Sequence, residues 1–306
     1  MENNIEGLVE MKNSFKIYAL MTVKNEADIV IEALEHASLW ADKIFVIDNN
    51  SSDSTFSLIR EYANVNPKII IWGQYGGAFY LGLRQVLFKD YREIAKEGDW
   101  WCRLDGDEFY IDDPRDFLSA IPGNFDHVYN ASFQYYFTYD DYINEKNSLS
   151  SEISVLKRLE WYKCNHSEIR FVKHTNLICW PQLLEWPCNL RYPYSKRIRL
   201  KHYQYRSINQ IDARLALRNA PDSGTSFTHE KVSVEQWYSK RKFTAPDSEE
   251  LKLYRVVNND DLTNSSDFKY NDEELPPVRP YNYKKKIRNF MINFYMSFMN
   301  KYFFKI

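Results

Sequence analysis

Short apolar runs alternate with amphipathic stretches through the first third of the chain. The runs are rich in β-branched and aromatic side chains and are too short for core helices, so they predict buried strands at 17–23, 43–47, 69–72 and 100–104. Apolar residues recur at three- and four-residue steps in the stretches between them, which predicts helices at 27–40, 56–62 and 78–97. This alternation predicts parallel β-α-β units of an α/β fold.

Polar segments follow these predicted strands. Residues 22–26, 48–53 and 105–108 each come directly after an apolar run, and the last of them contains three carboxylates in the order Asp-Gly-Asp-Glu. In parallel units the carboxyl ends of the strands share one edge of the sheet, where open α/β sheets bind ligands. We therefore expect a binding site at this edge.

The second half of the chain carries a weaker pattern. It predicts a strand at 127–139, a polar loop at 140–152, several short strands within 170–204 and a helix at 208–220. We expect an extension at 1–14, a catalytic domain at 15–244 with a nucleotide half (15–120) and an acceptor half (121–244), and a linker at 245–283. The pattern at 284–306 predicts a basic cluster and an amphipathic helix, which could lie on an anionic membrane surface or pack against protein.

Composition narrows the possible partners. Forty basic and 42 acidic residues leave a net charge of -2, so we expect no nucleic-acid partner. The many aromatic residues (8 Trp, 23 Tyr and 19 Phe) suit clefts that receive sugars or bases. The four cysteines contain no C-x-x-C pair, and we expect reduced, buried thiols. We find no secretory signal in residues 1–13 and expect a cytoplasmic protein.

Asp105 and Asp107 are the first candidates for a metal site. Two carboxylates separated by one glycine at a strand end can both reach one divalent cation, and that cation can also hold two phosphates. The alternative is an ordinary Asp-Gly turn with solvated acids. A phosphate-binding glycine loop is absent, because Thr22-Val-Lys-Asn-Glu26 follows the first predicted strand, so a metal would have to hold the phosphates.

With these motifs the chain resembles family 2 glycosyltransferases of the GT-A fold, in a bacterial subgroup. The resemblance rests on TVKNEA at 22–27, VIDNNSSDST at 46–55 and LDGDEF at 104–109, and it covers about residues 15–120. It implies a Rossmann-like mixed sheet flanked by helices, followed here by a C-terminal helical extension. It also implies inverting, Mn²⁺- or Mg²⁺-dependent transfer of a sugar from a nucleoside-diphosphate donor, with a UDP-sugar favoured. The acceptor would be a glycan or glycolipid (lipid-linked) in bacterial surface polysaccharide assembly. A peripheral location at the inner face of the cell membrane is compatible with that role.

The resemblance also assigns residues to roles. The D-x-D motif maps onto Asp105 and Asp107 as metal ligands, and His202 could complete the metal shell or touch the diphosphate with Arg206. A structural role for His202 is the alternative. The residues assigned to the nucleotide are Thr22, Lys24, Asn25, Glu26, Asp48, Arg84 and Asp105.

An inverting transferase needs a carboxylate that deprotonates the acceptor hydroxyl, and we expect it in the second half. Glu185 is our candidate, because it follows a predicted strand at 170–180 and has Trp180 and Trp186 beside it to stack on a sugar ring. The competing candidates are Glu160, Glu168 and Asp141.

Two departures from the usual family pattern weaken the predicted stacking contact to the nucleotide base. Val-Lys stands before Asn25 in place of Pro-x-Tyr, and Asp-Asn-Asn-Ser replaces Asp-Asp-Gly-Ser at 48–51. Two other functions remain open. One is a non-catalytic nucleotide- or glycan-binding relative tethered to the membrane, and the other is a metal-dependent nucleotidyltransferase.

Overall fold

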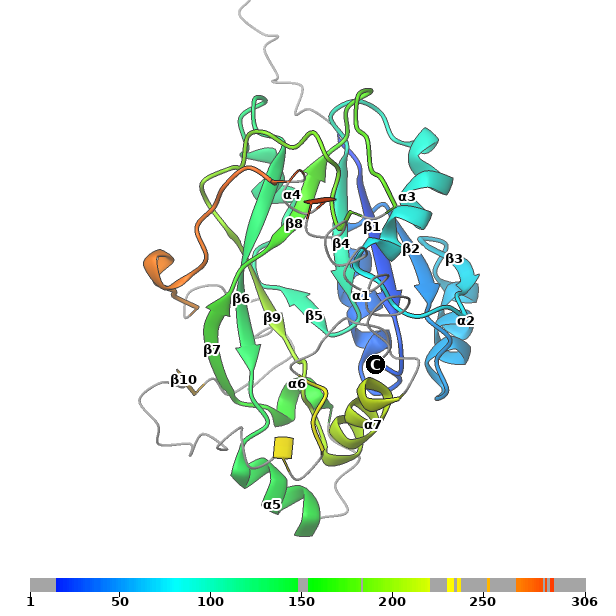
Figure 1. Cartoon of the computed structure of the whole chain (residues 1–306), viewed down its shortest axis with the longest axis vertical. Helices are drawn as coiled ribbons and strands as arrows, with labels where there is room; N and C mark the ends of the chain where they lie inside the picture. The colour runs from blue at the N-terminus through cyan, green and yellow to red at the C-terminus, as the bar shows by residue number, and fades with distance from the viewer. Residues whose placement is uncertain are drawn as a thin grey trace, which may run out of the picture.

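The computed structural model of the chain shows a mixed β-sheet flanked by helices (Figure 1). It describes residues 15–147, 154–182, 184–220, 230–233, 236–237, 252–253, 268–282, 284 and 287–288. The predicted extension 1–14 and nearly all of the predicted helix 284–306 lie outside the described residues, as does most of the predicted linker 245–283. Within the described residues, no helix is both long and apolar enough to cross a bilayer.

The strands run in the order β10-β7-β6-β8-β4-β1-β2-β3 across the sheet, and β9 joins β5 to β6 beside this path. Their bounds are β1 Ile17–Val23, β2 Lys43–Asp48, β3 Ile69–Gln74, β4 Trp100–Asp105, β5 Glu108–Tyr110, β6 His127–Tyr135, β7 Trp161–His166, β8 Ile169–Lys173, β9 Ile198–His202 and β10 Lys252–Leu253. Strands β3, β2, β1 and β4 are parallel, whereas β8 pairs antiparallel with both β4 and β6. The predicted fold class, a Rossmann-like mixed α/β sheet flanked by helices, is therefore confirmed.

Helices cover both faces of the parallel strands. Their bounds are α1 Val30–Trp40, α2 Thr55–Val65, α3 Arg84–Tyr91, α4 Pro114–Ser119, α5 Tyr139–Asn147, α6 Val155–Arg158 and α7 Ile208–Asn219, with 3-10 turns at η1 Leu81–Leu83, η2 Arg92–Ile94 and η5 Asp272–Glu274. Successive residues of a strand point to opposite faces. Met21 of β1 accordingly packs with α1 and Ile59 of α2, whereas Leu20 packs with Leu87 and Phe88 of α3.

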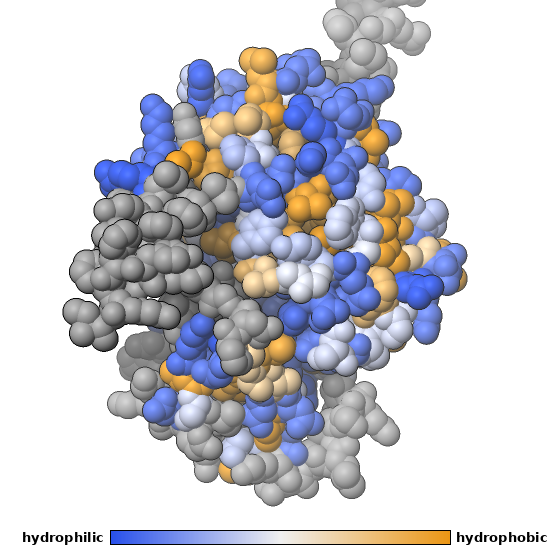
Figure 2. Space-filling view, turned by 45° about the vertical axis from the view of Figure 1, so that its right-hand side comes forward, coloured by the Kyte–Doolittle hydropathy of each residue, from blue (hydrophilic) through white to orange (hydrophobic). Residues whose placement is uncertain are grey.

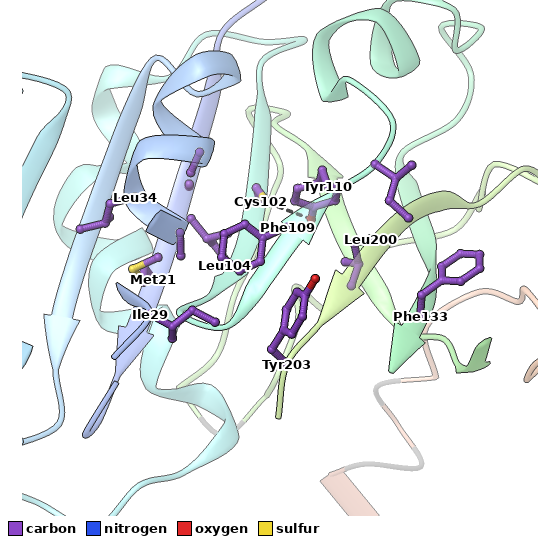
Figure 3. Close-up of a cluster of buried hydrophobic side chains, with 14 of the residues drawn as sticks. Met21, Ile29, Leu34, Cys102, Leu104, Phe109, Tyr110, Phe133, Leu200 and Tyr203 are labelled. Atoms are coloured by element: carbon purple, nitrogen blue, oxygen red, sulfur yellow. Dashed lines mark hydrogen bonds between the residues drawn. The ribbon is translucent and has the colours of Figure 1, made fainter. Parts of the chain in front are cut away.

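The core on the α1 side extends into the second half of the molecule. Figure 3 shows it running from Met21 through Leu104 and Phe109 to Leu200 and Phe133, so that β1, β4, β5, β9 and β6 share one apolar interior. On the outer face seen in Figure 2, apolar side chains lie in small separate groups among polar ones. The described surface of this face is thus predominantly polar.

The predicted strands of the first half and the helices near 27–40, 56–62 and 208–220 are confirmed within a few residues. The helix predicted at 78–97 is wrong, because only Arg84–Tyr91 is α-helical and the extended backbone of Tyr80 precedes it. The polar loop predicted at 140–152 is also wrong where the structure describes it, since α5 occupies part of it. Strand β8 ends at Lys173, well short of the predicted 180. The sequence patterns did not indicate β5, β7, α4 or α6.

Residues 268–282 pack against the second half. Phe268 and Leu275 are buried, and Arg197 of the loop before β9 donates hydrogen bonds to Asp272 (2.6 Å) and to the carbonyl of Pro276 (2.7 Å). This segment therefore covers the outer side of β6 and β9.

Candidate active site

A cavity of about 940 Å³ lies at the carboxyl edge of β1, β2 and β4. Register explains why the motifs meet there, because Thr22 of β1 lies beside Asp105 of β4, and Val23 lies beside Asp48 of β2. The sequence-predicted residues that line the cavity are Thr22, Lys24, Asn25, Glu26, Asp105, Asp107, Glu185 and His202. Asp48 and Arg84, also predicted for the site, do not line it.

The loops after β1 and β2 form one hydrogen-bonded wall of this cavity. Asn25 adopts a left-handed backbone conformation (φ 55°), which asparagine tolerates better than most residues. Its backbone N–H donates to Ser51 Oγ (2.9 Å), and its Oδ1 accepts from the N–H of Ser52 (2.8 Å). Lys24 Nζ donates to the carbonyl of Asn49 (2.8 Å). These bonds fix the two motif segments to each other.

Asp48 stabilises the turn after β2. It is 1% exposed and accepts hydrogen bonds from the N–H of Ser51 (2.9 Å), from Ser51 Oγ (2.5 Å) and from Gln74 Nε2 (2.9 Å). Asn49, the next residue, lines the cavity in its place. Asp48 therefore stabilises the cavity wall without facing the cavity itself.

Arg84 also acts from behind the cavity wall. Its buried guanidinium donates to the carbonyls of Leu20 (3.1 Å) and Leu104 (3.2 Å), and it forms an ion pair with Asp105. It therefore ties the ends of β1 and β4 together and holds Asp105 in place.

Asp105 is surrounded by positive charge. Its Oδ1 pairs with Arg84, and its Oδ2 lies 2.8 Å from Arg170 Nη1 and 3.6 Å from Arg103 Nε. Burial alone would raise the pKa of Asp105, but the three guanidinium groups outweigh it and hold that pKa well below its usual range. Asp105 is therefore an anion whose two oxygens both contact arginines.

Arg170 lies among three carboxylates. It is 1% exposed and contacts Asp105, Glu108 and Glu168, the last at 2.7 Å. Among the described residues these acids form a group whose oxygens lie within 4.8 Å of one another, a spacing that could hold a divalent cation. Glu108 Oε2 is buried and has no hydrogen-bond partner among the described residues, and burial raises the pKa of Glu108 to about 7. The guanidinium of Arg170 already supplies a positive charge to these three acids.

Asp107 and His202 offer a second set of ligand atoms. Antiparallel pairing of β5 with β9 places His202 opposite Glu108, so that His202 Nε2 lies 3.4 Å from Asp107 Oδ2. Burial would raise the pKa of Asp107, but His202 and Arg206 lower it to about 2. Ligands about 2.1 Å from an octahedral ion lie about 3 Å apart, so the 3.4 Å spacing of this pair suits a divalent cation, whereas both oxygens of Asp105 already contact arginines.

Of the candidate bases, Glu185 and Glu168 line the cavity, and Glu160 and Asp141 do not. Glu185 Oε1 accepts a hydrogen bond from Arg103 Nη1 (2.5 Å). Glu168 contacts both Arg103 (2.9 Å) and Arg170, and although burial opposes it, these arginines hold the pKa of Glu168 well below its usual range. A carboxylate held so strongly as an anion is a weak proton acceptor.

Trp180 and Trp186 lie in the core beside α3. Both are buried, and their rings stack at 5.8 Å. The prediction that they stack on a sugar ring is therefore wrong. Aromatic side chains that do line the cavity include Phe79, Tyr136 and Tyr205.

Sequence reasoning missed two arginines of α7, Arg214 and Arg218, which line the cavity. Their four-residue spacing places them on one face of the helix. Buried Glu230 accepts from Arg214 Nε (3.1 Å), Arg218 Nε (2.9 Å) and Tyr205 Oη (2.6 Å). The helical spacing could have identified the arginines, but nothing in the sequence indicated Glu230.

Neither a protein-family model nor a curated protein matches the sequence. A search of solved structures finds the mannosyltransferase PcManGT from Pyrobaculum calidifontis in complex with GDP-Man and Mn²⁺, at 17% identity and a TM-score of 0.31, covering 38% of this chain and 36% of that chain. It also finds S. aureus TarS 1–349 in complex with UDP, at 16% identity and a TM-score of 0.30, covering 39% and 35%. A second structure of TarS 1–349 is similar at 13% identity and a TM-score of 0.33, covering 71% and 68%. The chain therefore spans only about a third of the length of the first two.

Proposed function

We propose that this chain is an inverting glycosyltransferase of the family 2 type. It would move a sugar from a nucleoside-diphosphate donor, with a UDP-sugar favoured, to a hydroxyl of a glycan or lipid-linked acceptor. The setting that the motifs suggest is bacterial surface polysaccharide assembly. The observation that carries the proposal is the convergence of three motif segments with Glu185 and His202 in one cavity.

The walls of this cavity suit the two ends of such a donor. The hydrogen-bonded loops around Asn25 and Asn49 would bind the nucleoside, since they present backbone and amide groups at the sheet edge. The diphosphate would lie toward Arg214 and Arg218, whose guanidinium groups suit bidentate contact with phosphate oxygens. Glu230 fixes both arginines through their Nε atoms.

A bound Mn²⁺ or Mg²⁺ would be held by Asp107 and His202 and would supply positive charge for the departing nucleoside diphosphate. Asp105 is better suited to the nucleotide side than to direct metal ligation, because both of its oxygens contact arginines. Its negative charge balances the arginines that hold Glu185 and Glu168.

The transfer itself requires one proton acceptor. The acceptor oxygen forms a bond to the anomeric carbon while the bond from that carbon to the phosphate oxygen breaks, and the hydroxyl proton passes to Glu185. Arg103 orients this carboxylate through its 2.5 Å contact. We favour Glu185 over Glu168 because Arg103 and Arg170 both contact Glu168 and hold its pKa well below its usual range, which makes it a weak proton acceptor.

Calorimetry of UDP and GDP binding, with Mn²⁺ and with a chelator, tests the site. We expect Asp107→Asn and His202→Gln to weaken Mn²⁺-dependent binding by about tenfold or more, in line with the loss of a metal ligand or its support. Glu160→Gln, which removes a charge away from the cavity, is the matched control and should bind as the wild type does. Equal metal-dependent affinity for all four proteins would overturn the site.

A panel of nucleotide sugars, assayed for hydrolysis and for transfer, tests the chemistry. Glu185→Gln keeps the size of the side chain and should lower kcat by about 10²–10⁴-fold while leaving donor affinity unchanged. Unchanged turnover would assign the base elsewhere, with Glu168→Gln as the next variant. Tight nucleotide binding without turnover of any donor would instead favour the non-catalytic alternative.

A further inference from the structure

The loop between β8 and β9 that carries Glu185 is closed at its neck by hydrogen bonds. The backbone N–H of Cys188 donates to the carbonyl of Cys179 (2.9 Å). Beside this contact, Asn189 Nδ2 donates to the carbonyl of Leu177 (2.8 Å), and Asn189 Oδ1 accepts from the N–H of Cys179 (3.4 Å). We call residues 179–188 the Glu185 loop.

The inside of the Glu185 loop is packed against α3 and η1. Trp180 Nε1 donates to the carbonyl of Leu184 (2.9 Å), and the Trp180 ring lies 5.2 Å from that of Phe88. Gly82 of η1 meets the loop so closely that an added Cβ would lie 2.1 Å from the carbonyl oxygen of Gln182. The loop is thus a compact unit that holds Glu185 at the cavity wall.

Two thiols face each other at the neck of this loop. Cys179 is exposed and Cys188 is partly buried, which corrects the expectation that all four cysteines are buried. Burial raises the pKa of the Cys188 thiol, and its contact with the Cys179 thiol adds to that effect. A backbone hydrogen bond joins the two residues directly, and the contact between their thiols means that both side chains point to the same side, as a disulfide requires.

The other cysteines are poorly placed to compete. Cys102 is buried in β4, where its Sγ contacts Tyr110 Oη at 3.4 Å, and Cys164 lies in β7. At the neck, by contrast, the exposed Cys179 can react with an oxidant, and the neighbouring Cys188 can then attack the mixed disulfide that forms.

We propose that Cys179 and Cys188 form a reversible disulfide, with a low-molecular-weight disulfide such as oxidised glutathione as the oxidant. The Cys179 thiolate attacks one sulfur of the oxidant and releases one thiolate, which leaves a mixed disulfide on Cys179. The Cys188 thiolate then attacks Cys179 Sγ and releases the second thiolate. The two cysteines lose two protons and two electrons, and the oxidant becomes two thiols.

The bond would turn the Glu185 loop into a covalent ring. A cross-link restricts the unfolded chain and any opening of the segment that it encloses, so the oxidised protein should be more stable to heat than the reduced protein. Because Glu185 lies within the ring, the bond also restricts how far this carboxylate can move from Arg103. The disulfide does not depend on the proposed transferase activity and can be tested without it.

The test is intact-mass analysis and non-reducing peptide mapping of the full chain after treatment with oxidised glutathione. We expect a loss of about 2 Da, a cross-linked peptide pair containing Cys179 and Cys188, and complete reversal by a reductant. The melting temperature should rise by a few degrees on oxidation and return on reduction. Cys164→Ser is the matched control and should behave as the wild type does.

The single variants separate the steps. Cys188→Ser should keep glutathione as a stable adduct on Cys179, because the resolving thiol is missing, and Cys179→Ser should lose the cross-link. Serine is nearly the same size as cysteine, so both variants should fold. A circular dichroism spectrum like that of the wild type will establish this. A wild-type protein that keeps the glutathione adduct, gains no cross-link, or cross-links another pair would overturn the proposal.

Discussion

Replacement of Arg170 by methionine should destabilise the protein by about 3–5 kcal/mol. The guanidinium is 1% exposed and contacts three carboxylates, and these acids differ in whether they keep another ion pair after the substitution. Asp105 keeps its ion pair with Arg84, and Glu168 keeps its pair with Arg103. Glu108 is fully buried, and the variant removes the one ion pair found for it among the described residues. Removing one partner of a buried pair costs about 3–5 kcal/mol, and methionine recovers little because it leaves the buried Glu108 without that ion pair.

The assay is urea unfolding followed by circular dichroism and by tryptophan fluorescence, whose coincidence tests two-state behaviour. Arg191→Met, on an exposed side chain, is the matched control and should change stability by less than about 0.5 kcal/mol. Glu108→Gln added to Arg170→Met should recover at least about 1 kcal/mol, because it replaces the buried carboxyl group that has lost its ion pair by a neutral amide. A loss below about 1 kcal/mol for Arg170→Met, or strict additivity of the two changes, would refute the reasoning.

Three further substitutions probe other parts of the fold. Gly82→Ala drives a Cβ into the loop between β8 and β9 and should cost about 1–3 kcal/mol in urea unfolding, whereas Gly123→Ala, with open space around it, should be nearly neutral; equal effects would contradict this. Burial lowers the pKa of His36 from 6.5 to about 4, so the folded state binds fewer protons than the unfolded state between these values, and stability should fall as pH falls. Between pH 7 and pH 5 this effect should lower the free energy of unfolding by about 1–2 kcal/mol, a figure reduced for the partial exposure of His36. His36→Gln should remove this part of the pH dependence, and a variant with the same pH dependence as the wild type would contradict the prediction. Thr55→Val removes the acceptor of the N–H of Glu26 (2.8 Å) and should cost about 1–3 kcal/mol, while Thr55→Ser retains stability; loss of stability in both would point to packing instead.

The location of the site could be predicted from the sequence because its signals are local. The runs that form β1, β2 and β4 are continuous, and parallel pairing then brings Thr22, Asp48 and Asp105 to one edge. The helix predicted at 78–97 is interrupted, by contrast, where Gly82 contacts a loop about a hundred residues later, and no local sequence pattern indicates that contact. Tertiary contact of this kind overrides helical periodicity.

The electrostatics of the site could not be predicted for the same reason. Asp105 is a metal candidate by its motif, but its partner Arg170 lies 65 residues later in the chain, on β8, and Glu168 directly precedes that strand. The motif establishes where a carboxylate lies, and the remote arginines determine what that carboxylate can bind. A D-x-D motif alone therefore does not identify which of its two acids is available to a cation.

Arg206 extends this argument to the whole cavity. It is fully buried, forms two 2.8 Å bonds to Asp28 and one of 2.5 Å to Glu26, and lies 3.6 Å from Asp107. Its partners follow β1 and β4, whereas Arg206 itself follows β9, so a buried charge of the second half neutralises acids of the first. Without that cation, burial would push the already raised pKa of Glu26, about 7, still higher, and Asp107 would lose part of the attraction that keeps it charged. Arg206, a buried cation of the second half, therefore helps to keep Asp107 charged where burial would otherwise favour its neutral form.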